Sequence, residues 1–339
     1  MEIKVDLFSD TGTRPDKKMR KFMAEAEVGD EQLMEDPSVN QLNEMVAEIL
    51  GKKEAIYLPS GLMANQISFA VHCRSGDEII MDKTAHPIHY EAGGTAVISG
   101  ASINPLPGTR GIYTIEQVKE AVRSKDYHEP QTRLISIENT SNLGGGSIWP
   151  LEEINKITKF AHNNGFATHM DGARLLNAVA ATGIKAKEYA ANFDSVWIDL
   201  SKGLGAPVGS VLAGSSKFIE KARYWKQRLG GAMRQAGIIA AGGIYALENN
   251  RERLRDDNEN AKLLAEGMGN INGIEINPEY VETNIVLFKV SNYTANKFAE
   301  LMLKEGLRFS RLENYLRAVT HLGIDREDIE YVLDVIEVL

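Results

Sequence analysis

The sequence predicts an α/β protein with a mostly parallel central sheet in a large domain, followed by a smaller C-terminal α/β domain. Two observations carry this prediction: helical and strand patterns alternate along most of the chain, and the pattern changes after a long helical region around residues 234–268. The chain has 339 residues, of which 43% are hydrophobic and 25% charged, so it can bury a substantial core. We expect an N-terminal arm and large domain over 1–245 and a small domain over 246–339.

The first helix and strand of the large domain are predicted between residues 42 and 58. Apolar residues from Leu42 to Leu50 recur at helical spacing, and Gly51 ends the pattern. The short apolar run AIYL (55–58) then predicts a buried strand. A Pro-Ser-Gly turn and another helical stretch follow it.

The same alternation recurs in the middle of the chain. Strands are predicted over 134–139, 166–171 and 193–200, and the helical pattern between the first two ends at Gly165. Strands separated by helices form parallel sheets, in which ligands bind beyond the C-terminal strand ends. Residues that directly follow these strands are therefore candidates for a functional site.

The C-terminal part of the chain has a different order of predicted helices and strands. A long helical region covers about 234–268, after which GIEIN, TNIVLFKV and LRAVTH predict strands around a helix near 294–305. A final helix is expected behind the capping residue Asp325. Its apolar face consists of Ile329, Val332, Leu333 and Ile336.

Composition excludes several classes of function. The net charge of −9 opposes nonspecific binding to nucleic acid or anionic membranes, and no uncharged run approaches the roughly 20 residues of a membrane span. The single cysteine, Cys73, permits no intramolecular disulfide and lies in an apolar run, which favours a buried thiol. The first residues lack a signal-peptide pattern, so we expect a cytoplasmic protein.

The stretch PSGLMANQ contains a first candidate site. Gly61 follows a strand and opens a helix, where free backbone N–H groups suit a phosphate. An ordinary strand-to-helix turn is the alternative, and these residues alone favour it.

The stretch HMDGAR contains a second candidate. Asp171 at a strand end can hold a protonated ring nitrogen, with Arg174 on the same side of the helix that follows. Asp171 can equally cap a helix that begins at Gly172, and from these residues alone the cap is the favoured interpretation.

Lys202 stands between an apolar strand and the glycine-rich run GLGAPVG. An apolar setting favours the neutral, nucleophilic amine that forms a Schiff base, whereas most lysines are simply solvated. The spacing G-x-G-x-x-x-G, interrupted by a proline, does not match a dinucleotide fingerprint.

Histidines and arginines complete the set of candidates. His86, His89 and Glu91 in HPIHYE lack the helical spacing of a zinc site, so we expect no metal and interpret one histidine as a stacking ring or proton carrier. His128 has the same interpretation, and a surface loop is the alternative for each. Arg234 and Arg317 suit phosphate and carboxylate, respectively, unless they are isolated surface arginines.

Taken together, FSDTGTRP, PSGLMANQ, AHPIHYEAGG, IENTSN, HMDGAR, LSKGLGAPVGS, GGAMRQAG and RAVTH resemble the threonine aldolases along almost the whole chain. These are enzymes of the aspartate-aminotransferase-like fold type I that depend on pyridoxal 5'-phosphate (PLP). The resemblance implies cleavage of L-threonine, L-allo-threonine and related β-hydroxy-α-amino acids to glycine and an aldehyde. Another PLP reaction, such as β-elimination or transamination, and a non-catalytic PLP-binding protein are the alternatives.

The resemblance also implies a role for individual residues. Lys202 forms the Schiff base with PLP, Asp171 pairs with the pyridine nitrogen, and Arg174 lies near the phenolic oxygen. His86 stacks on the ring and is a candidate for proton transfer, and His128 is the second histidine expected at the substrate hydroxyl. The other implied residues bind the phosphate (Ser60, Gly61, Leu62 and, from a neighbouring subunit, Arg234) or the substrate carboxylate (Ser9, Arg174 and Arg317).

The resemblance also predicts the oligomeric state, and two positions of this chain differ from the family pattern. The resemblance implies a homotetramer, built as a dimer of dimers with active sites at subunit interfaces. Leu62 stands where relatives often have threonine, which removes a hydroxyl but no amide donor. Gln227 stands where some have lysine, with Lys226 and Arg228 as candidate substitutes.

Overall fold

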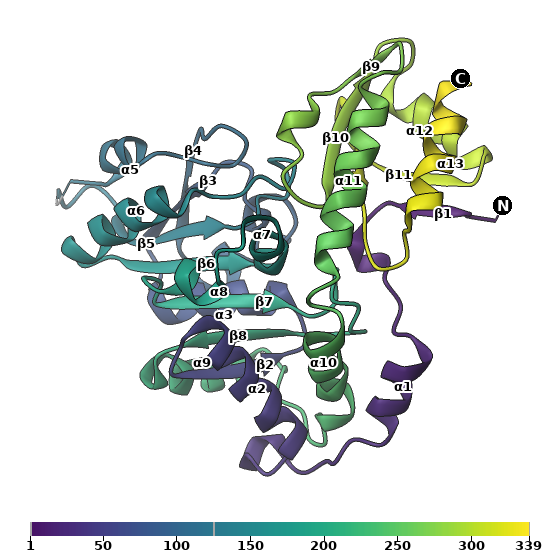
Figure 1. Ribbon diagram of the computed structural model, residues 1–339. Coiled ribbons are helices and arrows are strands. Elements are labelled where there is room, and N and C mark those ends of the chain that lie inside the picture. Colours follow the sequence, from purple (N-terminus) through teal and green to yellow (C-terminus); the bar gives the residue numbers. More distant parts are fainter. Residues whose placement is uncertain (1, 125, 339) are drawn as a thin grey trace.

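The computed structural model describes residues 2–124 and 126–338, which form two β-sheets with helices packed around them (Figure 1). The larger sheet has seven strands in the order β2-β8-β7-β6-β5-β3-β4, and only β8 runs antiparallel to its neighbours. The fold class predicted from the sequence, including the mostly parallel sheet, is therefore confirmed. The strands are β2 (Glu54–Leu58), β3 (Asp77–Asp82), β4 (Ser102–Leu106), β5 (Gln131–Glu138), β6 (Ala167–Gly172), β7 (Ser195–Asp199) and β8 (Ser210–Gly214).

The helices predicted after residues 42, 60 and 150 are present in the structure as α2, α3 and α6. The helix with the apolar pattern from Leu42 to Leu50 begins earlier, at Pro37, behind the capping carboxylate of Asp36, and Gly51 ends it with φ +62°. The helices are α1 (Lys17–Ala24), α2 (Pro37–Leu50), α3 (Gly61–His72), α4 (His86–His89), α5 (Ile115–Ala121), α6 (Leu151–Asn163), α7 (Leu175–Thr182), α8 (Ala186–Ala190), α9 (Ser216–Arg228) and α10 (Gly237–Asn249).

The sheet brings three acidic residues to one edge. Strands β5, β6 and β7 are parallel neighbours, and Glu138 lies beside Asp171 in the register of β5 and β6. Asp199 ends β7, whose five residues are all buried. Lys202 follows three residues later, so polar groups from distant segments meet at the C-terminal ends of these strands.

The smaller sheet has the order β1-β11-β12-β10-β9 and lies beside the larger one (Figure 1). Its strand β1 pairs in parallel with β11, so the N-terminal segment contributes to the same sheet as the C-terminal residues. The domain division at 245/246 stays a prediction. The elements are β1 (Val5–Leu7), β9 (Ile274–Glu275), β10 (Ile285–Val290), β11 (Leu307–Leu312) and β12 (Tyr315–Val319), with α11 (Leu254–Met268), α12 (Ala295–Lys304) and α13 (Arg326–Glu337).

Several local predictions have a clear outcome. Asp325 caps α13 by accepting a hydrogen bond from the Asp328 N–H, as predicted. Cys73 is buried, which raises the pKa of its thiol to about 12. The helical region over 234–268 is divided into α10 and α11 by the segment 250–253.

The alternative interpretation of Asp171 as a helix cap is wrong. Helix α7 begins at Leu175, and the side chain of Asp171 instead accepts a hydrogen bond from the Ala173 N–H in the preceding turn. None of the helices in the described ranges has both the length and the apolarity needed to cross a membrane.

Candidate active site

A cavity of about 300 Å³ lies where β5, β6 and β7 end and α3 begins. This is at the lower end of the volumes found for small-molecule sites. Seven residues singled out in the sequence line it: Ser60, Gly61, Leu62, His86, Asp171, Arg174 and Lys202. The structure thus brings together residues that are up to 142 positions apart in the sequence.

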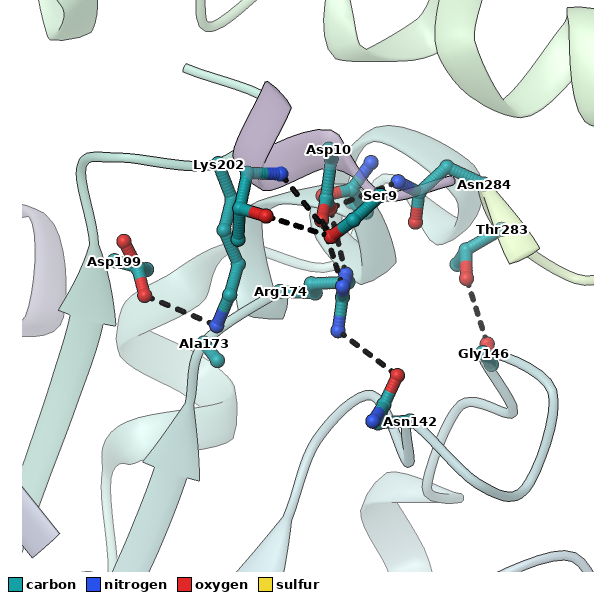
Figure 2. A network of polar contacts seen from close by, with 12 residues as sticks. Ser9, Asp10, Asn142, Gly146, Ala173, Arg174, Asp199, Lys202, Thr283 and Asn284 are labelled. Carbon is teal, nitrogen blue, oxygen red and sulfur yellow. Dashed lines mark hydrogen bonds and ion pairs between the residues drawn. The ribbon is translucent and has the colours of Figure 1, made fainter. Parts of the chain in front are cut away.

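Lys202 lies on the turn after β7 and points toward Asp199 (Figure 2). The Lys202 Nζ is 3.0 Å from Asp199 Oδ2, and the other oxygen of Asp199 accepts hydrogen bonds from the backbone and hydroxyl of Ser201. No motif in the sequence pointed to Asp199. Its signal is a carboxylate at the last position of an apolar strand, three residues before the candidate lysine.

Asp171 lies at the end of β6 with 4% of its surface exposed. Its Oδ1 accepts the Ala173 N–H and its Oδ2 accepts Asn65 Nδ2 at 2.9 Å. Burial raises the pKa of Asp171, although Lys202 and His86 oppose this shift by their positive charge. A cation placed against this carboxylate stabilises its ionised form, which is the arrangement a protonated pyridine nitrogen requires.

The N-terminus of α3 forms one wall of the cavity. Ser60 is its N-cap and accepts the Met63 N–H at 3.2 Å, while the first N–H groups, at Gly61 and Leu62, have no acceptor within the helix. A Cβ on Gly61 would lie 2.3 Å from the Trp197 ring, so only glycine fits there. This end of the helix can bind an anion through its backbone.

His86 opens the short helix α4 and also lines the cavity. Its backbone N–H donates to Glu138 Oε2 at 2.8 Å, and its Nδ1 lies 2.8 Å from Glu91 Oε1. Burial and the neighbouring Asp171 raise the pKa of Glu138 to about 7. Neither glutamate was assigned a role in the sequence.

Arg174 is buried and held by Asp10 in a two-point ion pair (Figure 2). Its Nε and Nη2 each donate to a different oxygen of Asp10 at 2.7 Å. Burial opposes ionisation of Asp10, but the contacts with Arg174 hold the pKa of this carboxyl well below its usual range. The guanidinium therefore has only part of its donor set left for a ligand.

Arg317 reaches the same region from β12. Its Nη1 donates to Asn142 Oδ1 at 2.7 Å, the same oxygen that lies 3.5 Å from Arg174 Nη1. The buried Arg317 Nε has no hydrogen-bond partner among the described residues. Ser9 lies close by, capping the short 3-10 turn Asp10–Gly12, and Figure 2 shows it beside Asp10 and Arg174.

Four of the predicted residues do not line the cavity within this chain: Ser9, Arg317, His128 and Arg234. Of these, Arg317 contacts the lining residue Asn142. The His128 side chain is 69% exposed and pairs with Asp126, and the Arg234 side chain is 63% exposed and pairs with Asp30. Their predicted roles stay predictions. Of the two candidate substitutes for a missing lysine, Lys226 is buried in an ion pair with Glu31, and Arg228 packs over Trp225.

The chemistry of the cavity fits PLP. It offers a primary amine for the aldehyde, a buried carboxylate for the ring nitrogen and a helix N-terminus for the phosphate. No cluster of three metal-binding side chains occurs within residues 2–124 and 126–338.

Known proteins support the same assignment. The family model described as "Beta-eliminating lyase" matches residues 6–291. The chain is 40% identical to a low-specificity L-threonine aldolase of Arabidopsis thaliana, over 97% of the chain and 94% of the relative, and 39% identical to that of Escherichia coli, over 97% of each. The structure of Leishmania major threonine aldolase superimposes with a TM-score of 0.86 at 18% identity, covering 98% of both chains.

Proposed function

The chain belongs to the beta-eliminating lyases and, within them, to the low-specificity L-threonine aldolases, and from this premise we propose the reaction it catalyses. It is a PLP-dependent lyase that cleaves L-threonine, L-allo-threonine and related β-hydroxy-α-amino acids to glycine and an aldehyde. The observation that carries this proposal is the convergence of Lys202, Asp171 and the N-terminus of α3 on one cavity.

We propose that three groups hold the cofactor. Lys202 binds its aldehyde, Asp171 its ring nitrogen, and the backbone at Ser60, Gly61 and Leu62 its phosphate. When bound, PLP supplies an electron sink for the bond that breaks at Cα of the substrate. Asp171 keeps the ring nitrogen protonated, because a cation there is favoured by the buried carboxylate.

Arg317 is the main group that orients the substrate in this proposal. Its Nη1 donates to Asn142 and its Nε has no partner among the described residues, whereas two N–H groups of Arg174 already donate to Asp10. A carboxylate held by Arg317, with Arg174 and Ser9 beside it, fixes which bond at Cα is aligned for cleavage.

His86 carries the proton in the cleavage step. It lines the cavity, and a neutral imidazole nitrogen facing the substrate accepts the proton of the β-hydroxyl, either directly or through a water molecule. Loss of this proton allows the Cα–Cβ bond to break and release the aldehyde. His128 is proposed as a second group near the hydroxyl, supplied to the site of a neighbouring subunit.

A coupled aldehyde assay on the purified protein tests the reaction. We expect acetaldehyde and glycine from L-threonine, and loss of turnover in Lys202→Ala but not in Lys159→Ala, which alters an exposed lysine of α6. Formation of a keto acid without aldehyde would identify β-elimination or transamination instead. Full turnover in Lys202→Ala would refute the covalent role of this amine.

The assembly and compartment are also proposals. A homotetramer with sites at its interfaces would explain why Arg234 is exposed in the single chain, since it would then reach the phosphate of a neighbour's cofactor. Light scattering gives the mass of the assembly, and loss of cofactor in Arg234→Ala would support the shared site. A cytoplasmic role in threonine catabolism agrees with the acidic composition and single cysteine.

A further inference from the structure

Asn65, on the inner side of α3, has an amide whose orientation is fixed by its neighbours. Its Oδ1 lies 2.7 Å from Trp197 Nε1, and an indole N–H only donates, so this atom must be the oxygen. The nitrogen therefore faces two carboxylates, Asp171 Oδ2 at 2.9 Å and Glu91 Oε1 at 2.7 Å. Asn65 is 1% exposed and donates one N–H to each of these carboxylates.

A buried chain of hydrogen bonds behind Asn65 has one consistent direction. Because the oxygen of Asn65 accepts, His169 Nε2 must donate to it, and His169 Nδ1 must accept from the Ser195 hydroxyl. The Ser195 oxygen then accepts from His72 Nε2. Burial lowers the pKa of both histidines, that of His72 to about 4, which agrees with two neutral rings.

Glu91 receives three donors and is 2% exposed. Its Oε1 accepts Asn65 Nδ2 and lies 2.8 Å from His86 Nδ1, and its Oε2 accepts Gln66 Nε2 at 2.5 Å. Both oxygens of Glu91 thus act as acceptors of N–H groups, and the oxygen that faces His86 also accepts the Asn65 N–H. His86 must then carry a proton on Nδ1, which leaves Nε2 as the unprotonated nitrogen of the neutral ring.

We propose that Glu91 is the positioning residue that fixes the tautomer and orientation of His86, and that Asn65 ties it to Asp171. The inference rests on the proposed function in one respect, which is that His86 is the base. Glu91 thereby presents Nε2 of His86 to the β-hydroxyl. Asn65 holds Glu91 and Asp171 at a fixed separation, so the proton acceptor and the carboxylate for the ring nitrogen form one rigid unit.

Several charged groups surround His86. The carboxylates of Glu91, Asp171 and Glu138 favour its protonated form, and Tyr90 packs against its ring with centroids 5.4 Å apart. Burial opposes protonation, but the hydrogen bond to Glu91 and these charges raise the pKa of His86 above its usual value. Two cations, Lys202 and Arg174, line the same cavity.

Two substitutions separate the charge of Glu91 from its hydrogen bonds. In Glu91→Gln the new amide can keep its oxygen toward Asn65 and His86, because Gln66 Oε1 has no partner among the described residues and can rotate to accept the new N–H. This variant removes the charge and keeps the tautomer. Glu91→Leu removes both, and Glu78→Gln, at another buried glutamate that pairs with Arg123, is the matched control.

Solid-state ¹⁵N NMR of the histidine-labelled holoenzyme reports the tautomer and pKa of His86 directly, with His86→Asn assigning its signals. We expect an Nδ1–H tautomer in wild type and in Glu91→Gln, with the pKa lower by about one unit or more in the variant. The acidic limb of the kcat/KM profile should shift by the same amount. Glu91→Leu should lose the fixed tautomer and about 100-fold or more in kcat, with KM changed less.

The measurements test the positioning role of Glu91 independently of the proposed reaction. An unchanged pKa of His86 in Glu91→Gln, or a retained Nδ1–H tautomer in Glu91→Leu, would overturn it. Shifts of equal size in Glu78→Gln would also overturn it, because they would reflect general destabilisation. If wild type cleaves no threonine while the tautomer still depends on Glu91, the proposed function fails and the positioning role stands.

Discussion

Asp10→Asn tests whether the buried ion pair with Arg174 stabilises the protein. Asp10 is fully buried and Arg174 is 6% exposed. Asp10 Oδ2 accepts from Arg174 Nε and Asn284, while Oδ1 accepts from Arg174 Nη2. In either orientation of an amide at this position, its NH₂ group faces an N–H donor. The buried guanidinium of Arg174 then loses one hydrogen-bond acceptor and the negative charge of Asp10.

Breaking one partner of a buried pair costs about 3–5 kcal/mol, and we expect a loss of this size in the free energy of unfolding. Urea unfolding followed by tryptophan fluorescence measures it, with Asp256→Asn as the control at an exposed aspartate. The control should change stability by about 0.5 kcal/mol or less. The loss in Asp10→Asn should be about the same from pH 6 to 8 and shrink as the pH falls below about 4, because a carboxyl with a lowered pKa stabilises the fold only when ionised. A loss no larger than that of the control would refute the reasoning.

Three further predictions concern the cavity and the chain behind it. Gly61→Ala should lose bound cofactor on gel filtration, measured by absorbance, since its Cβ would lie 2.3 Å from a ring carbon; Gly12→Ala, with no atom within 4 Å, should retain it. Arg317→Gln should raise KM for threonine about 10- to 100-fold in steady-state kinetics, because a hydrogen bond to a charged group contributes about 1.5–3 kcal/mol. An unchanged KM would count against the binding of the substrate carboxylate by Arg317. Burial lowers the pKa of His72 from 6.5 to about 4 in the folded protein, so protonation favours the unfolded chain. The free energy of unfolding therefore falls as the pH drops from 6.5 toward 4. Wild type should therefore lose about 2 kcal/mol more than His72→Asn between pH 7 and pH 5, and parallel losses in the two proteins would contradict this assignment.

The parts of the site that could be predicted from the sequence share one property. Ser60, Asp171 and Lys202 each lie at or just after the end of an apolar strand, and parallel strands place such positions at one edge of a sheet. Local pattern and topology together were enough to group them. The same argument could not decide between a helix cap and a ligand at Asp171, because a helix start is uncertain by several residues.

The arginines show where the sequence was insufficient. Arg174 was expected to bind cofactor and substrate, but its Nε and Nη2 both donate in this chain to Asp10, a residue 164 positions away. The contact depends on β1 joining the smaller sheet in parallel with β11, which brings the segment after β1 to the cavity. A three-residue strand at the start of the chain gave no periodic signal for that pairing.

Asn65 and Glu91 show why the proton-positioning residues had no signal in the sequence. On a helix with one apolar face, Asn65, Gln66 and Ser68 would be assigned to the solvent side, yet all residues from 64 to 70 of α3 are buried. The Asn65 side chain is inside because it satisfies partners 26, 106 and 132 positions away, at Glu91, Asp171 and Trp197. Since an unpaired amide at this depth would destabilise the fold, a polar residue inside an all-buried helix indicates an internal hydrogen-bond network, and here the network ends at the histidine that lines the cavity.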